Sequence, residues 1–213
     1  AIGTRTLASP GNYLAKLSRA VIEALDDGAP TPLAGKLREM LAALEAQRQY
    51  DLVLIDVRAG LAEIAAGPIL TLDAEVLIFG TAQRQTLQDL GFLLAHLASL
   101  SRDVRPSPWS RLKMVHAKAA QAAEAGAFRD ELWILFSEHV YEESVGLDEF
   151  NFDVNAPEAP HSPIFIPLDI AFADWDPVGR PDRLLDTYYS RTFGELVDYV
   201  EDLLGAGEDD AQE

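Results

Sequence analysis

The stretch Tyr50–Leu61, YDLVLIDVRAGL, decides the fold class predicted for this chain. Leu52–Ile55 is a run of apolar residues with no polar alternation. A strand that is apolar on both faces is typical of the centre of a parallel sheet covered by helices on both sides. We therefore predict a central buried strand over residues 52–56, ending in the carboxylate of Asp56.

Asp56 has two possible roles at the end of that strand. In open α/β sheets, ligands bind outside the carboxyl ends of the strands, so Asp56 is a candidate metal-site or phosphate-site residue. Asp is also a favoured residue at the start of a helix, so a plain helix cap is the alternative. Position alone does not separate these two interpretations.

Apolar patterns on either side of this stretch predict an alternation of helices and strands. Further strands are expected over 74–79, 112–116 and 164–166, and helices over 9–25, 33–48, 61–72, 87–100, 119–145 and 184–204. The long acidic loop 146–160 lies between the last two strands, and a loop of this length in a compact domain is usually functional or mobile. Short apolar strands separated by helices predict an α/β fold with a mostly parallel sheet and helices on both faces.

The composition argues against several classes of function. The formal net charge is −18, which disfavours binding of nucleic acid by the whole domain and binding to anionic membranes. The chain has no Cys, no apolar run near the ~20 residues of a membrane span, and no basic-then-apolar leader. We expect a cytoplasmic protein, with self-association or a protein partner.

Four segments in order resemble the MinD/ParA-type deviant Walker ATPases of the SIMIBI class, and most closely the KGGVGR-motif variants. They are YDLVLIDVRAGL at 50–61, AEVLIFGTAQRQTLQDL at 74–90, LKMVHAK at 112–118 and PIFIPLD at 163–169. The resemblance covers about residues 1–170. It implies a three-layer, P-loop NTPase-like fold and an ATPase that uses ATP and Mg²⁺.

On the phosphate side, the first segment matches the family's Walker B or switch II motif, D-x-x-A-G. The resemblance implies that Asp56 holds the nucleotide Mg²⁺ and takes part in catalysis. In the same turn, Arg58 is a candidate to reach phosphate or a partner subunit, because Arg suits bidentate phosphate contact. Gly60 is a candidate to give a switch loop its backbone freedom. An ion-paired surface Arg and an ordinary turn glycine are the alternatives.

On the base side, the resemblance implies that His116 and Lys118 contact the nucleotide, although His116 stands where the family has Asn. It also implies that Pro167 and Asp169 shape the base pocket. The alternatives are local hydrogen bonding for His116 and Lys118, and an ordinary turn for the other two. The remaining histidines show no metal-ligand spacing, and Asp174 and Asp176 are typical solvated loop acids.

The family's Gly-rich, Lys-bearing phosphate loop has no counterpart in this sequence. Because the first residue is Ala1, we expect the C-terminal portion of a longer ATPase, with the N-terminal part of the fold missing. Residues 1–205 would form a single α/β domain and residues 206–213 a disordered acidic tail. ATP hydrolysis, with bound ATP and Mg²⁺, is then expected only for the full-length protein.

A degenerate fold of this type that works as a non-catalytic protein–protein interaction module is the alternative function. The acidic surface and the 146–160 loop would serve such a role. A receiver-like or dinucleotide-binding domain fits less well, because the sequence lacks G-x-G-x-x-G and the acidic cluster of a receiver. The acidic polar face of the last helix, residues 192–204, favours packing or a partner over membrane binding.

Overall fold

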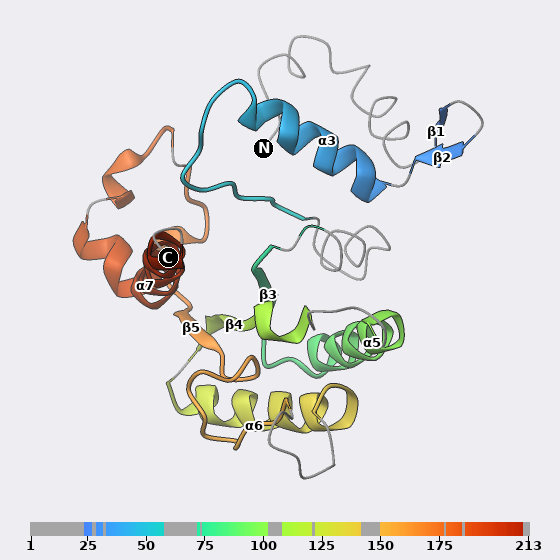
Figure 1. Ribbon diagram of the computed structural model, residues 1–213. Coiled ribbons are helices and arrows are strands. Elements are labelled where there is room, and N and C mark those ends of the chain that lie inside the picture. Colours follow the sequence, from blue (N-terminus) through green and yellow to red (C-terminus); the bar gives the residue numbers. More distant parts are fainter. Residues whose placement is uncertain are drawn as a thin grey trace. The chain divides into compact units, whose positions relative to one another are not determined.

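The computed structural model describes residues 24–26, 29–31, 33–57, 72, 74–101, 108–120, 122–141, 150–176, 178–184 and 186–210 (Figure 1). The chain divides into two compact units, residues 1–74 and residues 75–213. The sequence analysis treated residues 1–205 as one domain. Each unit is described here by itself.

The described part of the first unit contains a short antiparallel hairpin and one helix. Strands β1 (Ala24–Asp26) and β2 (Ala29–Thr31) pair with each other, and helix α3 (Leu33–Glu45) follows. The predicted helix over 33–48 is confirmed. The helix predicted over 9–25 is wrong at its described end, where Ala24 and Leu25 belong to β1. Its remaining residues lie outside the described residues. So does the helix predicted over 61–72, except for Leu72, which lies in a bend.

The central buried strand predicted over residues 52–56 is wrong. These residues have no regular secondary structure, and Leu52–Val57 is exposed, with Leu54 at 80% exposure. A continuous apolar run favours an extended, buried conformation, but it becomes a strand only when a neighbouring strand accepts its backbone hydrogen bonds. Among the described residues, no strand pairs with this run.

The second unit is built on a three-stranded parallel sheet in the order β3–β4–β5. Its elements are β3 (Val76–Gly80), α5 (Arg84–Ser101), η1 (Pro108–Arg111), β4 (Leu112–Ala119), α6 (Ala122–His139), β5 (Ile164–Pro167), η2 (Ile170–Phe172), η3 (Pro181–Leu184) and α7 (Asp186–Asp210). The predicted α/β class with parallel strands is confirmed. Strand β4 is longer than predicted, and α7 continues as helix to Asp210, into the predicted tail.

Two neighbouring residues of β4 pack against side chains of different helices. Val115 forms a buried cluster with Ile164 and Ile166, and side chains of α7, among them Phe193, pack against it. The next residue, His116, points to the opposite face of β4, because side chains alternate along a strand. There its ring lies 4.3 Å from that of Phe128 on α6.

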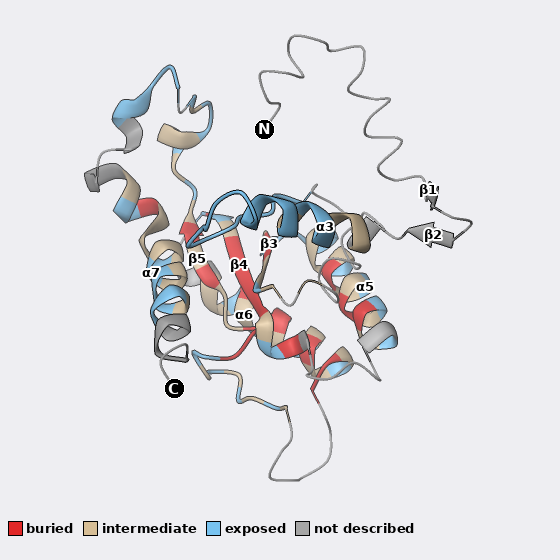
Figure 2. Cartoon of the chain, turned by 45° about the horizontal axis from the view of Figure 1, so that its top comes forward, coloured by how far each residue is buried: buried red, intermediate tan, exposed pale blue. Residues whose placement is uncertain are grey.

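The core of the second unit is concentrated on β4 and on the inward sides of α5 and α6, as the burial colours of Figure 2 show. Its largest fully buried apolar side chains are Phe128, Phe136, Leu94, Leu97, Met114, Leu132 and Val115. Gly80 ends β3 where space is scarce, since an added Cβ would lie 3.2 Å from side-chain atoms of both Leu90 and Phe128. This packing leaves little room for a larger residue at the end of β3.

Candidate functional site

The loop that follows β5 forms the candidate site, at the carboxyl edge of the parallel sheet. Pro167 ends the strand, and Leu168, Asp169 and Ile170 follow. With Arg191 of α7 they line a hollow of about 480 Å³. Leu168 and Ile170 are exposed, Ile170 at 85%, so the loop presents apolar side chains beside one guanidinium group.

Asp169 holds this loop in shape. Its Oδ1 accepts a hydrogen bond of 2.8 Å from the backbone N–H of Ala171, which caps η2. Its Oδ2 accepts from Arg191 Nη2 at 2.7 Å and from Thr192 Oγ1 at 3.1 Å. These donors lower the pKa of Asp169, with the Ala171 N–H as the largest cause and the Arg191 hydrogen bond next. Both carboxylate oxygens are occupied, so Asp169 is suited to position the loop.

Arg191 and Thr192 were not singled out in the sequence. They lie on α7 more than twenty residues after Asp169, and their local pattern is that of an ordinary helix. Thr192 is buried, but its burial is seen only in the structure, so no signal in the sequence marks the pair. The contact depends on α7 packing against β5.

Strand β4 reaches the same edge of the sheet. The register between β4 and β5 shifts between His116 and Ala119, and Lys118 has a positive φ of 56°. The bulge leaves the Lys118 side chain exposed and aims the Ala119 carbonyl at the loop, where it accepts from the Leu168 N–H at 2.8 Å. The structure therefore brings Lys118, Pro167 and Asp169 to one edge of the sheet.

His116 does not lie at that edge. The sequence analysis ended its strand at residue 116, but β4 continues to Ala119. The imidazole is 1% exposed and contacts the rings of Phe128 and Phe165. His116 therefore lies in the core of the second unit.

The predicted phosphate-side residues belong to the first unit. Asp56 belongs to the first unit and is exposed, in a segment without regular structure. Arg58 and Gly60 lie outside the described residues. Among the residues that the structure describes, no group of three or more potential ligands could hold a metal ion.

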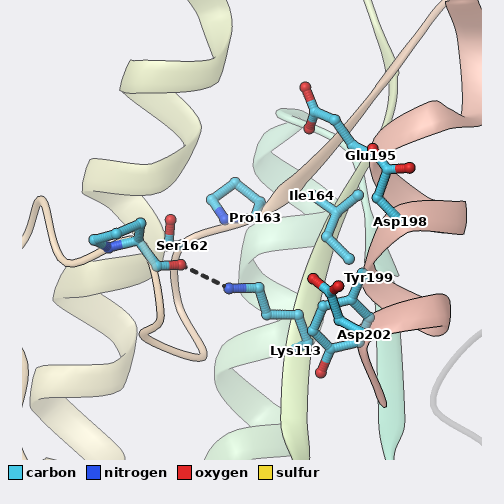
Figure 3. Close-up of a pocket in the computed structure, with 9 residues that line it drawn as sticks. Lys113, Ser162, Pro163, Ile164, Glu195, Asp198, Tyr199 and Asp202 are labelled. Carbon is cyan, nitrogen blue, oxygen red and sulfur yellow. Dashed lines mark hydrogen bonds between the residues drawn. The ribbon is translucent and has the colours of Figure 1, made fainter. Parts of the chain in front are cut away.

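A second hollow, of about 300 Å³, lies where β4 and β5 begin (Figure 3). Glu195, Asp198 and Asp202 line it from α7, and Lys113 lines it from β4. Lys113 is buried, and its Nζ donates to the carbonyl oxygens of Pro157 and Ala159 at 3.0 and 3.1 Å. Burial lowers the pKa of Lys113, and the charge of Glu158 opposes that shift.

These bonds fix the described part of the long acidic loop, and so they predict the effect of removing the Lys113 amine. Lys113→Met leaves two loop carbonyls without their donor, which costs about 1–3 kcal/mol of unfolding free energy. Chemical denaturation measures this loss, and faster amide exchange over residues 157–162 localises it. Lys118→Met is the matched control, because that lysine is exposed on the same strand. An equal loss of unfolding free energy in both variants would show that the lost positive charge, and not the two hydrogen bonds, causes the effect.

The same loop is anchored by a second buried polar network. His161 is fully buried, and its Nδ1 forms a short hydrogen bond with the Tyr141 hydroxyl. Its Nε2 lies 3.3 Å from the carbonyl oxygen of Val154, and Trp133 Nε1 donates to the carbonyl oxygen of Phe152 at 3.1 Å. The loop predicted as functional or mobile is therefore held against α6 over its described part.

Comparison with known proteins adds no assignment: the sequence matches no protein-family model, no curated protein and no solved structure. Within the described part of the chain, every helix is too short or too polar to cross a membrane. The assignment of the candidate site therefore rests on the geometry of its residues alone.

Proposed function

We propose that this chain supplies the base side of the nucleotide pocket in a MinD/ParA-like, nucleotide-switched ATPase with a three-layer, P-loop NTPase-like fold. The observation that carries this proposal is the Asp169-anchored loop at the carboxyl edge of a parallel sheet, with a hollow of about 480 Å³ beside it. Ligands of open α/β folds bind at this edge. The pocket is lined by residues suited to a planar, uncharged ring.

The chemistry of the lining residues supports a base. Leu168 and Ile170 offer apolar contact surface, and a heteroaromatic ring loses unfavourable water contact when it covers such side chains. The Arg191 guanidinium is planar and stacks well on aromatic rings. The backbone groups of the loop are held in place by Asp169, so they can serve as fixed hydrogen-bond partners for ring nitrogens.

The phosphate side of the proposed pocket needs groups that this sequence does not contain. Without a Gly-rich loop and its lysine, no cradle of N–H groups binds the β- and γ-phosphates. In the complete switch, Asp56 would hold Mg²⁺ and take part in catalysis, with Arg58 and Gly60 beside it and ATP as the cofactor. ATP would order a dimer or a partner complex, and hydrolysis would release it.

This division of roles predicts that the chain by itself does not hydrolyse ATP. Phosphate release, measured with and without Mg²⁺, should stay at the rate of buffer alone. Magnesium-dependent turnover that disappears in Asp56→Ala would contradict the proposal, because it would require a complete phosphate site in this chain.

Base binding is tested with adenosine and ATP as probes. Both should bind weakly and with equal affinity, because the phosphates of ATP find no partner here. Amide chemical shifts should move at Leu168–Ile170 and Arg191. Ile170→Ser should weaken adenosine binding, and Val178→Ser, at another largely exposed aliphatic side chain of the same unit, should not. The proposal fails if adenosine shifts no resonance in Leu168–Ile170.

A protein–protein interaction module is the second candidate, and the exposed run Leu52–Ile55 favours it. Exposed apolar runs of this kind mark partner-binding sites in soluble proteins. Under this proposal, Leu54→Ser would abolish partner binding, and ATP would leave it unchanged. Partner binding that requires ATP would favour the switch instead.

A further inference from the structure

The two outer edges of the sheet are built differently. The order β3–β4–β5 makes β3 one edge strand and β5 the other. An edge strand carries a row of unpaired backbone N–H and C=O groups, which is a template for another extended chain. Proteins that avoid such pairing block the edge with proline, charge or side-chain hydrogen bonds.

The β5 edge is blocked. Pro163 precedes the strand, and Pro167 ends it. The Phe165 N–H, which would face an incoming strand, donates to Glu195 Oε2 at 2.9 Å. Helix α7 packs along this strand. No extended chain can add here without displacing the Glu195 carboxylate.

Among the described residues, strand β3 itself carries none of these devices, although the charged residue Glu75 directly precedes it. Val76–Gly80, VLIFG, contains no proline and no charged residue. Among the described residues, its only strand neighbour is β4, which pairs with it from Val76 to Gly80. Phe79 is 55% exposed, whereas the other residues of the strand are half-buried or buried. Its ring lies on a face of the sheet, where a residue opposite it on an added strand would contact it.

The chemistry of this edge specifies its occupant. Backbone groups along one side of a strand are satisfied only by another extended backbone. The exposed Phe79 ring favours an aliphatic or aromatic cross-strand neighbour. Pairing of two free chains through this edge is disfavoured because each copy carries a formal charge of −18, so the copies repel each other. The same charge favours a partner with basic residues beside its apolar core.

We propose that the outer edge of β3 binds an extended, apolar segment with basic flanks from another protein, by addition of a strand to the sheet. The ladder of backbone hydrogen bonds supplies affinity, and the contact with Phe79 supplies selectivity for an apolar residue opposite it. This surface is separate from the loop at Asp169, and its use does not require nucleotide.

The direct test uses a synthetic peptide, acetylated and amidated, with a valine–isoleucine core between paired lysines. It should bind the intact chain and slow amide hydrogen exchange in Val76–Gly80. The control peptide has the same sequence with N-methyl groups on alternate core residues, which keeps its charge and apolarity but removes ladder donors. Equal binding of both peptides would overturn the proposal, because binding would then depend on charge and apolarity and not on backbone hydrogen bonds.

Variants locate the site on the protein. Phe79→Lys should weaken peptide binding by about tenfold or more, a change of about 1.4 kcal/mol. Phe92→Lys is the matched control, because Phe92 is exposed on α5 at 67% and the charge change is the same. Phe79→Thr keeps a strand-forming residue and should weaken binding without an added charge. Unchanged binding to folded Phe79→Thr and Phe79→Lys, or a dimer of the free chain formed through β3, would overturn the proposal.

Discussion

Phe128→Ala should lower the unfolding free energy of this protein by about 3–5 kcal/mol, the usual cost of removing a buried phenylalanine ring. Phe128 is 1% exposed, and its ring lies 4.3 Å from that of His116. It also fills the space beside Gly80, where an added Cβ would lie 3.2 Å from Phe128 Cζ. The substitution leaves a cavity between α6 and the carboxyl ends of β3 and β4.

The comparison that isolates burial is Phe92→Ala on α5. Phe92 is largely exposed, so the same chemical change should alter the unfolding free energy by no more than about 0.5 kcal/mol. Both variants are measured by urea denaturation monitored by circular dichroism. Similar losses from the two would mean that the packing around Phe128 contributes little to stability.

A second large effect is expected from pH, through His161. Burial lowers the pKa of this imidazole below its ordinary value of 6.5, and the charges of Lys113 and Arg129 add to the shift. The hydrogen bond to Val154 and the charge of Asp153 oppose it. His161 is therefore neutral in the folded protein at neutral pH, and its Nδ1 can accept a hydrogen bond from the Tyr141 hydroxyl.

The direction of the pH effect follows from proton uptake. As pH falls below about 6.5, His161 of the unfolded chain takes up a proton that the folded chain resists. Stability is present above the unfolded pKa and is lost as pH falls toward the folded pKa. The slope from this one group reaches at most about 1.4 kcal/mol per pH unit.

Denaturation curves recorded from about pH 7.5 to about pH 5, a range that spans the ordinary histidine pKa, measure this slope. His161→Gln should be less stable than the wild type at neutral pH, and its slope should be shallower. His96→Gln, which changes an exposed histidine on α5, should keep the wild-type slope. The assignment to His161 fails if His161→Gln and the wild type lose stability in parallel.

The tests are separable. Loss of adenosine binding in Ile170→Ser concerns only the loop after β5, whereas loss of peptide binding in Phe79→Lys concerns only the outer edge of β3. The nucleotide proposal can fail while strand addition succeeds, and the reverse also holds. Neither test depends on the stability changes expected for Phe128→Ala.

The sequence determined the elements whose patterns are local. The heptad-like leucines over 87–100 predicted α5, and the short apolar segments at 74–79, 112–116 and 164–166 predicted β3, β4 and β5. Strands alternating with helices predicted parallel pairing, because a chain that crosses back over a sheet through a helix returns in the same direction. These features depend on side-chain periodicity, which each segment carries by itself.

The tertiary structure decided which of these residues meet. Leu52–Ile55 has the composition of a buried strand, yet it is exposed because no described strand pairs with it. His116 looked like the end of a strand, but the bulge before Ala119 places it in the core. The Asp169–Arg191 contact joins a loop to a helix far along the chain. Strand pairing, burial and long-range contacts depend on both of the segments that meet. A local sequence pattern describes only one of them.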